Sequence, residues 1–191
     1  MTELFNLGLN DKQVDLVLRA RAFAIMAHRE TNHTYGDEKV CYSYHLQETF
    51  DIGLKYIYLV PVSMRGVVLA SLWLHDTIED CRVNYSKIKE IFGEQVAEIV
   101  FALTNNKGRT RAERADERYY HGIKAIPLAD FCKICDRLAN VTYSSRSRGR
   151  MFQKYKKENR EFLMKIWNPE YTDMYLHLRN LLNPEGQIAK A

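Results

Sequence analysis

The chain has 191 residues, of which 46% are hydrophobic and 12% aromatic, which suits one globular domain with a substantial core. Its 9 glycines and 4 prolines are too few for a disordered chain or a β-sandwich, and its net charge of +4 is too small to indicate nucleic-acid binding. We expect an all-helical, single-domain protein over residues 1–191. Its core should lie at about 10–145, with C-terminal helices at 150–183 packing on it.

Nothing in the sequence indicates secretion or membrane insertion. The first residues lack a basic region followed by an apolar core, and the longest apolar run, Gly66 to Leu74, is too short to span a bilayer. A chain with this much core does not need disulfides, so its four cysteines indicate a reducing, cytoplasmic location. Cys132 and Cys135 have zinc-type spacing but no second pair, and we interpret them as core side chains.

Helical spacing of apolar residues marks the first elements. Asn10 is a good N-cap for a long helix that ends near His28, and the polar stretch from Arg29 to Val40 should be a loop. A short helix follows, with His45 at its start. The aromatic run from Lys55 to Pro61 has strand-like preferences but no partner strand, so we expect a buried linker or distorted helix.

The central buried helix should run from Met64 to His75. We expect Ser86 to cap the next helix and Gly93 to end it. The highly charged stretch from Arg109 to Tyr120 is typical of one solvated helix.

A further core helix is expected over Ile126 to Tyr143, with Asp136 four residues before Asn140. The two C-terminal amphipathic helices, Phe152 to Trp167 and Pro169 to Leu182, should be scaffold, and His177 should be exposed.

The densest group of ionisable side chains is His75-Asp76-Thr77-Ile78-Glu79-Asp80, at the end of the central apolar run. On a continuous helix, His75 would share a face with Glu79, and Asp76 with Asp80. Burying such groups costs several kcal/mol for each unpaired charge, so they should pair, bind a metal or face a cleft.

Two further residues complete a candidate metal site. His45, His75, Asp76 and Asp136 offer two imidazoles and two carboxylates from three separate helices. Mixed nitrogen and oxygen ligands suit an octahedral Mn²⁺, Fe²⁺ or similar ion better than a structural zinc. Four protein ligands would leave two positions for water and a substrate oxygen, which favours a hydrolase.

These motifs resemble those of the HD-domain phosphohydrolases, and among them the RelA/SpoT-type hydrolase domain and the small alarmone hydrolases. The resemblance runs from about Ala22 to Tyr143. It rests on Tyr42-Ser43-Tyr44-His45, His75 to Asp80, Phe92-Gly93-Glu94-Gln95-Val96, Leu103-Thr104-Asn105-Asn106-Lys107 and Cys135-Asp136-Arg137-Leu138-Ala139-Asn140. It implies an HD-type helical bundle and a Mn²⁺-dependent enzyme of the stringent response. Such an enzyme removes the 3′-pyrophosphate from (p)ppGpp, giving GDP or GTP, by attack of a metal-activated water.

The resemblance also implies roles for individual residues. His45, His75, Asp76 and Asp136 would bind the metal, and Glu79 and Asp80 would orient and deprotonate the water. Asn140 would contact the nucleotide, and Lys107, Arg111 and more weakly Lys156 would contact phosphate. The loop Glu30-Thr31-Asn32-His33-Thr34-Tyr35 lacks the family's arginine pair that packs on guanine, so His33 or Tyr35 would stack on a base instead.

That loop keeps a second substrate class open, in which the same fold and metal act on another nucleotide: a dNTP, a nucleoside monophosphate or NADPH. A third hypothesis is a catalytically silent module that binds nucleotide or nucleic acid through its basic patches. The adjacent Glu79 and Asp80 favour catalysis, because a pure binder of an anionic ligand has no need of two carboxylates beside it. We expect a small-molecule nucleotide substrate, no nucleic-acid partner and no membrane association.

Overall fold

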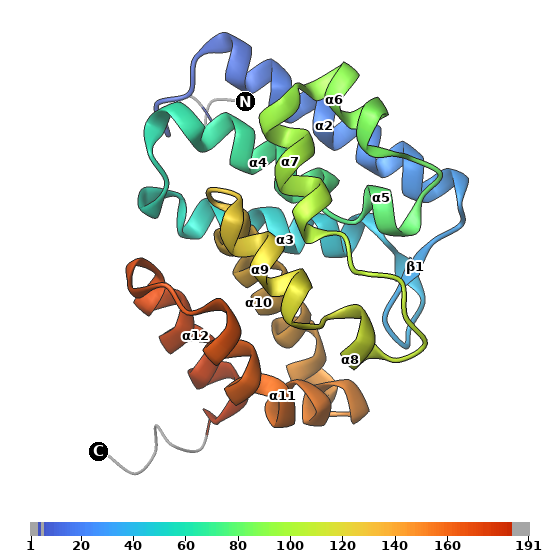
Figure 1. Cartoon of the computed structure of the whole chain (residues 1–191), viewed down its shortest axis with the longest axis vertical. Helices are drawn as coiled ribbons and strands as arrows, with labels where there is room; N and C mark the ends of the chain where they lie inside the picture. The colour runs from blue at the N-terminus through green and yellow to red at the C-terminus, as the bar shows by residue number, and fades with distance from the viewer. Residues whose placement is uncertain (1–3, 5, 185–191) are drawn as a thin grey trace.

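The computed structural model describes residue 4 and residues 6–184, except for the side chains of Arg111 and Ala112. The described part is an all-helical bundle with one small antiparallel hairpin, β1 (Thr34–Tyr35) and β2 (Val40–Cys41) (Figure 1). The expected all-α fold is therefore confirmed, and the hairpin falls in the stretch expected to be a loop except for its last residue, Cys41. The helices, labelled as in Figure 1, are α2 (Asp11–Glu30), α3 (Ser43–Lys55), α4 (Arg65–Leu74), α5 (Thr77–Asp80), α6 (Tyr85–Phe92), α7 (Glu94–Leu103), α8 (Arg111–Arg114), α9 (Glu117–Ala125), α10 (Ala129–Ser147), α11 (Arg150–Ile166) and α12 (Thr172–Leu182), with 3₁₀ turns η1 (Ile57–Leu59), η2 (Val62–Met64) and η3 (Pro169–Tyr171).

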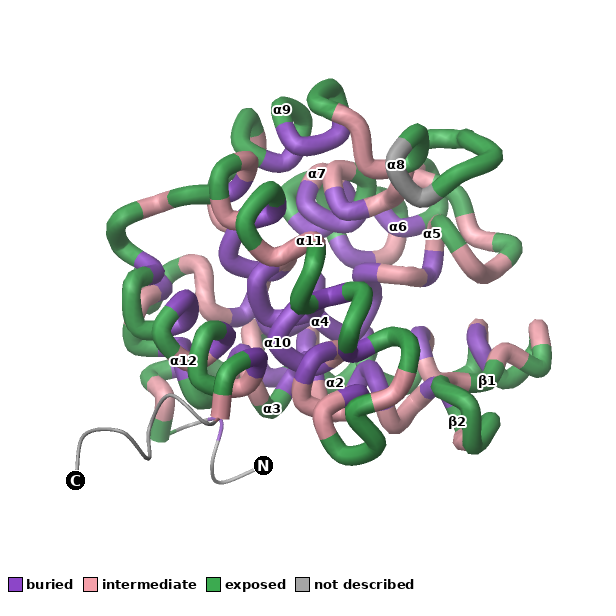
Figure 2. The backbone as a smooth tube through the Cα atoms, turned by 90° about the horizontal axis from the view of Figure 1, so that it is seen from below, coloured by how far each residue is buried: buried purple, intermediate pink, exposed green. Residues whose placement is uncertain are grey.

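Helices α4 and α10 form the centre of the molecule and are its most continuously buried segments (Figure 2). Helix α4 packs against α2, α3 and α7, while α10 packs against α3, α7, α9, α11 and α12. The approach of α2 to α4 is close at Gly66, where an added Cβ would lie 2.7 Å from the Cβ of Gln13. The buried centre thus brings together helices that carry the candidate site residues.

The expected ends of α2 and α6 are confirmed, but one expected cap is wrong. Asn10 caps α2 in a capping box with Gln13, and Gly93 ends α6 with φ of +90°. The cap of α6 is Asn84 and not Ser86, because the Asn84 side chain accepts a hydrogen bond from the backbone N–H of Lys87. Ser86 already lies inside the helix, whereas a cap residue needs the extended backbone that Asn84 has.

The charged stretch from Arg109 to Tyr120 is two short helices and not one. Asp116 has extended backbone angles, and its side chain accepts from the backbone N–H of Tyr119. This cap starts α9 and separates it from α8. The aromatic run after Lys55 folds as the 3₁₀ turn η1, in which Ile57 is buried, in agreement with the expected distorted helix.

Helices α11 and α12 cover the side of α10 that faces away from α2 (Figure 1). His177 on α12 was expected to be exposed, yet it is partly buried, with its Nδ1 3.0 Å from the hydroxyl of Tyr56. Cys132 and Cys135 are buried free thiols of α10, as expected. Within the described residues, no helix is long and apolar enough to cross a bilayer.

Candidate active site and metal centre

The chain breaks between α4 and α5, so α4 ends close to the expected His75, and His75 and Glu79 do not share a face of one continuous helix. The hydroxyl of Thr77 donates to the carbonyl of Leu74 at 2.7 Å, and the Nδ1 of His75 lies 2.8 Å from the carbonyl of Leu72. These side-chain contacts occupy carbonyl groups at the end of α4 that a continuing helix would use. The break directs His75 and Asp76 toward α3 and α10.

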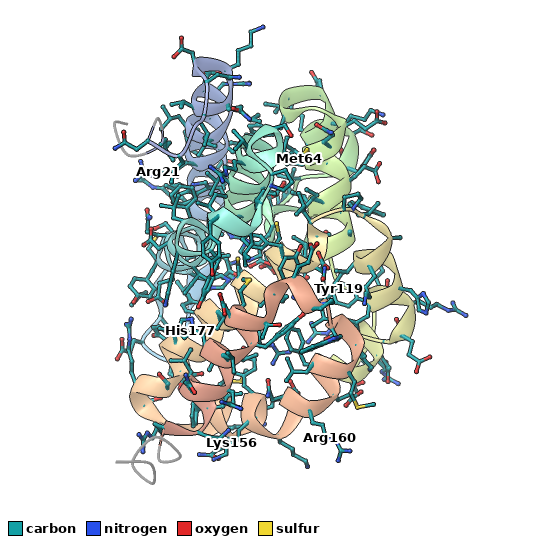
Figure 3. All side chains as sticks on the ribbon, turned by 90° about the vertical axis from the view of Figure 1, so that its left-hand side faces the viewer. Arg21, Met64, Tyr119, Lys156, Arg160 and His177 are labelled. Atoms are coloured by element: carbon teal, nitrogen blue, oxygen red, sulfur yellow. The ribbon has the colours of Figure 1, made fainter. Side chains whose placement is uncertain are left out.

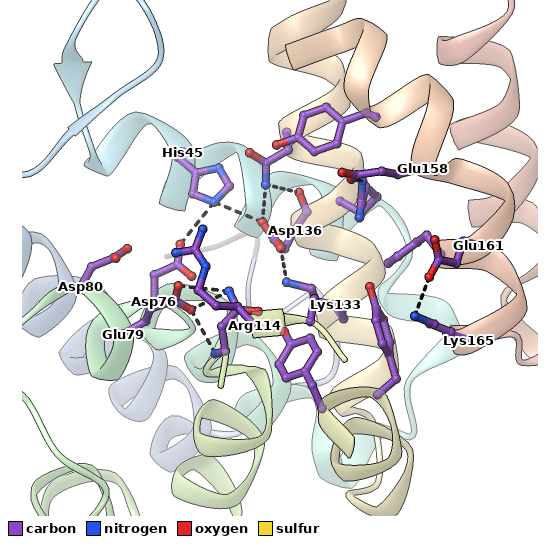
Figure 4. A pocket seen from close by; sticks show the side chains of 18 of the residues that line it. His45, Asp76, Glu79, Asp80, Arg114, Lys133, Asp136, Glu158, Glu161 and Lys165 are labelled. Atoms are coloured by element: carbon purple, nitrogen blue, oxygen red, sulfur yellow. Dashed lines mark hydrogen bonds and ion pairs between the residues drawn. The ribbon is translucent and has the colours of Figure 1, made fainter. Parts of the chain in front are cut away.

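His45, Asp76 and Asp136 lie close together (Figure 4), and His75 lies beside them. The Nε2 atoms of His45 and His75 lie 3.2 Å apart. The Oδ2 of Asp76 lies 2.9 Å from the Nε2 of His75 and 3.5 Å from the Nε2 of His45. The Oδ1 of Asp136 lies 3.3 Å from Nε2 of His45 and 3.8 Å from Nε2 of His75. Bonds of about 2.1 Å to one ion would place neighbouring ligand atoms about 3.0 to 3.5 Å apart, so His45, His75 and Asp76 fit a divalent cation, with Asp136 beside them.

Three of these four groups are held by a hydrogen-bonding neighbour, whereas the buried Nδ1 of His45 has no partner among the described residues. With its Nδ1–H donated to Leu72, neutral His75 carries its lone pair on Nε2, the atom that faces the other ligands. The Tyr42 hydroxyl donates to Oδ2 of Asp76, and Lys133 donates to Oδ2 of Asp136 at 2.9 Å. The ligand atoms are therefore oriented by the protein itself.

The electrostatics of the centre are those of closely paired opposite charges. Burial lowers the pKa of His45, but hydrogen bonds to Asp136 and Asp76 outweigh it and raise the pKa to about 9. Burial raises the pKa of Asp136, yet the charge of Lys133 and the hydrogen bond from His45 hold it well below its usual range. A cation at this point would replace the proton that His45 shares with the two carboxylates.

Glu79 and Asp80 lie beside the centre but point to different partners. The Glu79 carboxylate accepts from the side-chain amide of Asn105 at 2.9 and 3.0 Å, and from its backbone N–H at 3.1 Å. The Oδ2 of Asp80 lies 3.6 Å from the Nδ1 of His33. Burial, followed by the charges of Asp76 and Glu79, raises the pKa of Asp80 to about 7.

The centre opens into a cavity of about 310 Å³ between α5, α9, α10 and α11 (Figure 4). Carboxylates line its metal side. The lining also holds basic side chains that sequence reasoning did not identify as site residues: Arg114, Lys133, Arg137 and Lys165. Three of them lie close to a carboxylate that lines the same cavity, Lys133 to Asp136, Arg137 to Glu158 and Lys165 to Glu161. The position of Lys133, three residues before Asp136 on a helix, was a usable signal. For Arg114 and Lys165, which reach the cavity from other helices, no local pattern pointed there.

A second cavity, of about 190 Å³, adjoins the first, and Asn140 and Tyr155 line both. Tyr35, Gly36 and Tyr143 line its other parts. Gly36 has φ of +71°, and an added Cβ would clash with the hydroxyl of Tyr143. Among the described residues, that buried hydroxyl has no hydrogen-bond partner.

The structure brings some expected substrate residues to the cavities and leaves others outside. Asn140 donates to Asp136 and accepts from the Tyr35 hydroxyl at 3.0 Å, while the Tyr35 ring stacks on His45. Lys107 is exposed and does not line either cavity, and Lys156 points outward from α11 (Figure 3). The side chain of Arg111 lies outside the described residues. The substrate roles expected for these residues stay predictions.

The fold and the site together define an all-helical bundle with a candidate metal centre. A solved structure titled "A metazoan ortholog of SpoT hydrolyzes ppGpp and plays a role in starvation responses" shares this fold. Its TM-score is 0.72 at 18% identity, with 90% of this chain and 96% of that chain covered.

Curated relatives match over shorter segments. The guanosine-3′,5′-bis(diphosphate) 3′-pyrophosphohydrolase MESH1 of Danio rerio is 32% identical over 74 residues, 39% of this chain and 41% of that protein. The guanosine-3′,5′-bis(diphosphate) 3′-pyrophosphohydrolase of Aquifex aeolicus is 33% identical over 129 residues, 65% of this chain and 17% of that protein. Each match thus spans less than half of the relative's length, and no family model matches the chain. The resemblance to RelA/SpoT-type hydrolases is confirmed by these matches.

Proposed function

We propose that this chain is a metal-dependent hydrolase that removes the 3′-pyrophosphate from (p)ppGpp to give GDP or GTP. The observation that carries the proposal is the convergence of His45, His75, Asp76 and Asp136 next to two carboxylates, at the end of a cavity that basic side chains also line. Relatives named for this activity are similar to parts of this chain in sequence, and a protein whose title reports ppGpp hydrolysis shares the fold.

The proposed metal is Mn²⁺. Two imidazole nitrogens and two carboxylate oxygens suit a divalent ion of borderline hardness with open coordination positions. Such an ion, when bound, polarises a phosphoryl oxygen and lowers the pKa of water in its reach.

The chain's own residues would divide the remaining work between the two sides of the cavity. Glu79, held by Asn105, and Asp80 lie where a carboxylate can orient a water and take its proton. Lys133, Arg137 and Lys165 offer positive charge to the departing pyrophosphate across the cavity. Because Asn140 lines both cavities, the ribose would lie beside it and the base would enter the second cavity, near Tyr143.

The biological setting is part of the same proposal. An enzyme of this kind would act on a cytoplasmic nucleotide and lower its concentration in the stringent response. No membrane or nucleic-acid partner is invoked.

The test incubates the purified chain and Mn²⁺ with ppGpp, with dNTPs and with NADPH in parallel, and separates the products by chromatography. We expect GDP and pyrophosphate from ppGpp and little turnover of the other nucleotides. Turnover of a dNTP or NADPH alone would reject the substrate while keeping the hydrolase. The identity of the metal is tested by removing it with a chelator. We expect activity to be lost and then restored by Mn²⁺ more than by Mg²⁺.

A further inference from the structure

A second group of ligand-type side chains lies beside the four-ligand centre. His28 is in the last turn of α2, His33 lies just before β1, and Asp80 ends α5. These elements meet at one side of the molecule (Figure 1). One nitrogen from each histidine and one carboxylate oxygen of Asp80 lie within 4.8 Å of one another.

The two imidazoles face each other through the same atom. Their Nδ1 atoms are 3.1 Å apart, and the rings are inclined by only 21°. Both rings stack on Tyr42, His28 at 4.3 Å and His33 at 4.1 Å between centroids. Tyr42 therefore acts as a platform that holds the two nitrogen atoms side by side at one position.

The Asp80 carboxylate lies next to these two nitrogen atoms but is not hydrogen-bonded to His33. The Nδ1 of His33 lies 3.6 Å from Oδ2 of Asp80, which is too far for a hydrogen bond. Bonds of about 2.1 to 2.2 Å to one ion place neighbouring ligand atoms about 3.0 to 3.6 Å apart, which matches both separations.

We infer that His28, His33 and Asp80 form a second binding site for a divalent transition-metal ion, next to the first. Two imidazoles and one carboxylate are a ligand set used by three-ligand sites that keep an open position. The site is accessible, because the side chains of His33 and Asp80 are 32% and 27% exposed. Asp80 also lines the large cavity, so an ion held there has an open side toward it.

Tyr42 connects the two centres. Its ring carries the two imidazoles of the second site, and its hydroxyl donates to Asp76 of the first. One consequence rests on the proposed function: with an ion on Asp80, that carboxylate is a ligand, and Glu79 alone remains to take the proton of the attacking water. The presence of the ion itself does not depend on the substrate.

The experiment counts bound metal without any substrate. The protein, first freed of metal by chelation, is dialysed to equilibrium against Mn²⁺ or Zn²⁺, and its metal content is measured by mass spectrometry. We expect two equivalents in the unaltered chain. One equivalent is expected in His33→Ala, one in His75→Ala, and none in the double variant.

Two further variants secure the interpretation. Asp80→Asn keeps the shape of the side chain and should also bind one equivalent, and circular dichroism verifies the fold of each variant. His121→Ala removes an exposed histidine and should still bind two equivalents. The inference would be overturned if the unaltered chain bound only one equivalent of metal, whether Mn²⁺ or Zn²⁺ was used. It would also be overturned if His33→Ala and Asp80→Asn each still bound two equivalents. Because no nucleotide is used, failure of the proposed substrate leaves this result unaffected.

Discussion

At the scale of single residues, the site is positioned by polar contacts that exist without any ion. His75 is held by the carbonyl of Leu72, Asp76 by Tyr42, and Asp136 by Lys133. Such neighbours fix the orientation of ligand side chains and raise metal affinity. The centre should therefore bind its ion with little rearrangement of the side chains.

The different surroundings of His75 and Glu79 predict different losses on substitution. His75→Ala or Asp136→Ala should abolish both metal binding and activity, since each removes a ligand atom from the centre. Glu79→Gln should keep the metal and lower kcat by about 10²- to 10⁴-fold, the usual contribution of a general base.

Metal content by mass spectrometry and steady-state kinetics measure the two effects separately. Asn105, which donates to Glu79, can still bond to the carbonyl of the new glutamine, so the fold of Glu79→Gln should be preserved. Full activity in this variant would remove Glu79 from the proposed mechanism.

At the scale of elements, the site depends on where helices end. Apolar periodicity correctly predicted the long helices, because the signal for each is local in the chain. The break before Glu117 was missed, since it is decided by a side chain that bonds to the backbone. The periodicity of apolar or charged residues does not predict such a bond.

Thr77→Val tests the break between α4 and α5. The change keeps the shape of the buried side chain but removes the hydroxyl that donates to Leu74, so it should cost about 1 kcal/mol of unfolding free energy. It should also weaken metal binding, because His75 and Asp76 lie in the same turn.

Thr172→Val is the matched control. Thr172 makes the same kind of bond, to the carbonyl of Pro169, at the start of α12 and away from the site. Denaturant unfolding and metal titration compare the two variants. Equal metal affinity in both would show that the Thr77 hydroxyl does not position the ligands.

Two glycines near helix surfaces predict stability changes of opposite sign. Gly93 has φ of +90°, so Gly93→Ala should destabilise the protein by about 1 to 3 kcal/mol through backbone strain. Gly122 lies inside α9 with ordinary backbone angles, so Gly122→Ala should stabilise it by about 0.5 to 1 kcal/mol.

An added Cβ meets nothing within 4 Å at either position, so the two changes compare backbone conformation alone. Thermal unfolding measures both. A destabilised Gly122→Ala variant would contradict the expected helix effect.

At the scale of the whole molecule, helices from distant parts of the chain meet around α10. It contacts α3 on the metal side of the cavity, and α9 and α11, which line the cavity as well. The contacts of α11 and α12 with α10 accord with the expected packing of the C-terminal helices, while the extent of the domain over residues 1–191 stays a prediction.

The packing of α12 predicts how stability changes with pH. Burial, and then the charge of Lys55, lowers the pKa of His177 in the folded protein. The unfolded chain takes up a proton on this residue below about pH 6.5, whereas the folded chain resists it. Stability should therefore fall as the pH drops through 6.5 toward the lowered pKa.

His177→Asn should reduce that dependence, as measured by unfolding free energies at pH 7.5 and about pH 5. His121→Asn, at an exposed histidine, is the control and should leave the dependence unchanged. An identical pH dependence in both variants would contradict the prediction.

The sequence by itself predicted the all-helical fold, because periodic apolar residues are a local signal, and its resemblance to a known family singled out His45, His75, Asp76 and Asp136, which the structure brings together. Only the tertiary structure decided which cations face the cavity, where His33 and Tyr35 lie, and that His28, His33 and Asp80 meet. Arg114, Lys133 and Lys165 come from α8, α10 and α11, and their meeting depends on helix packing. Packing joins residues far apart in the chain, and no local pattern of apolar or charged residues records which of them will touch.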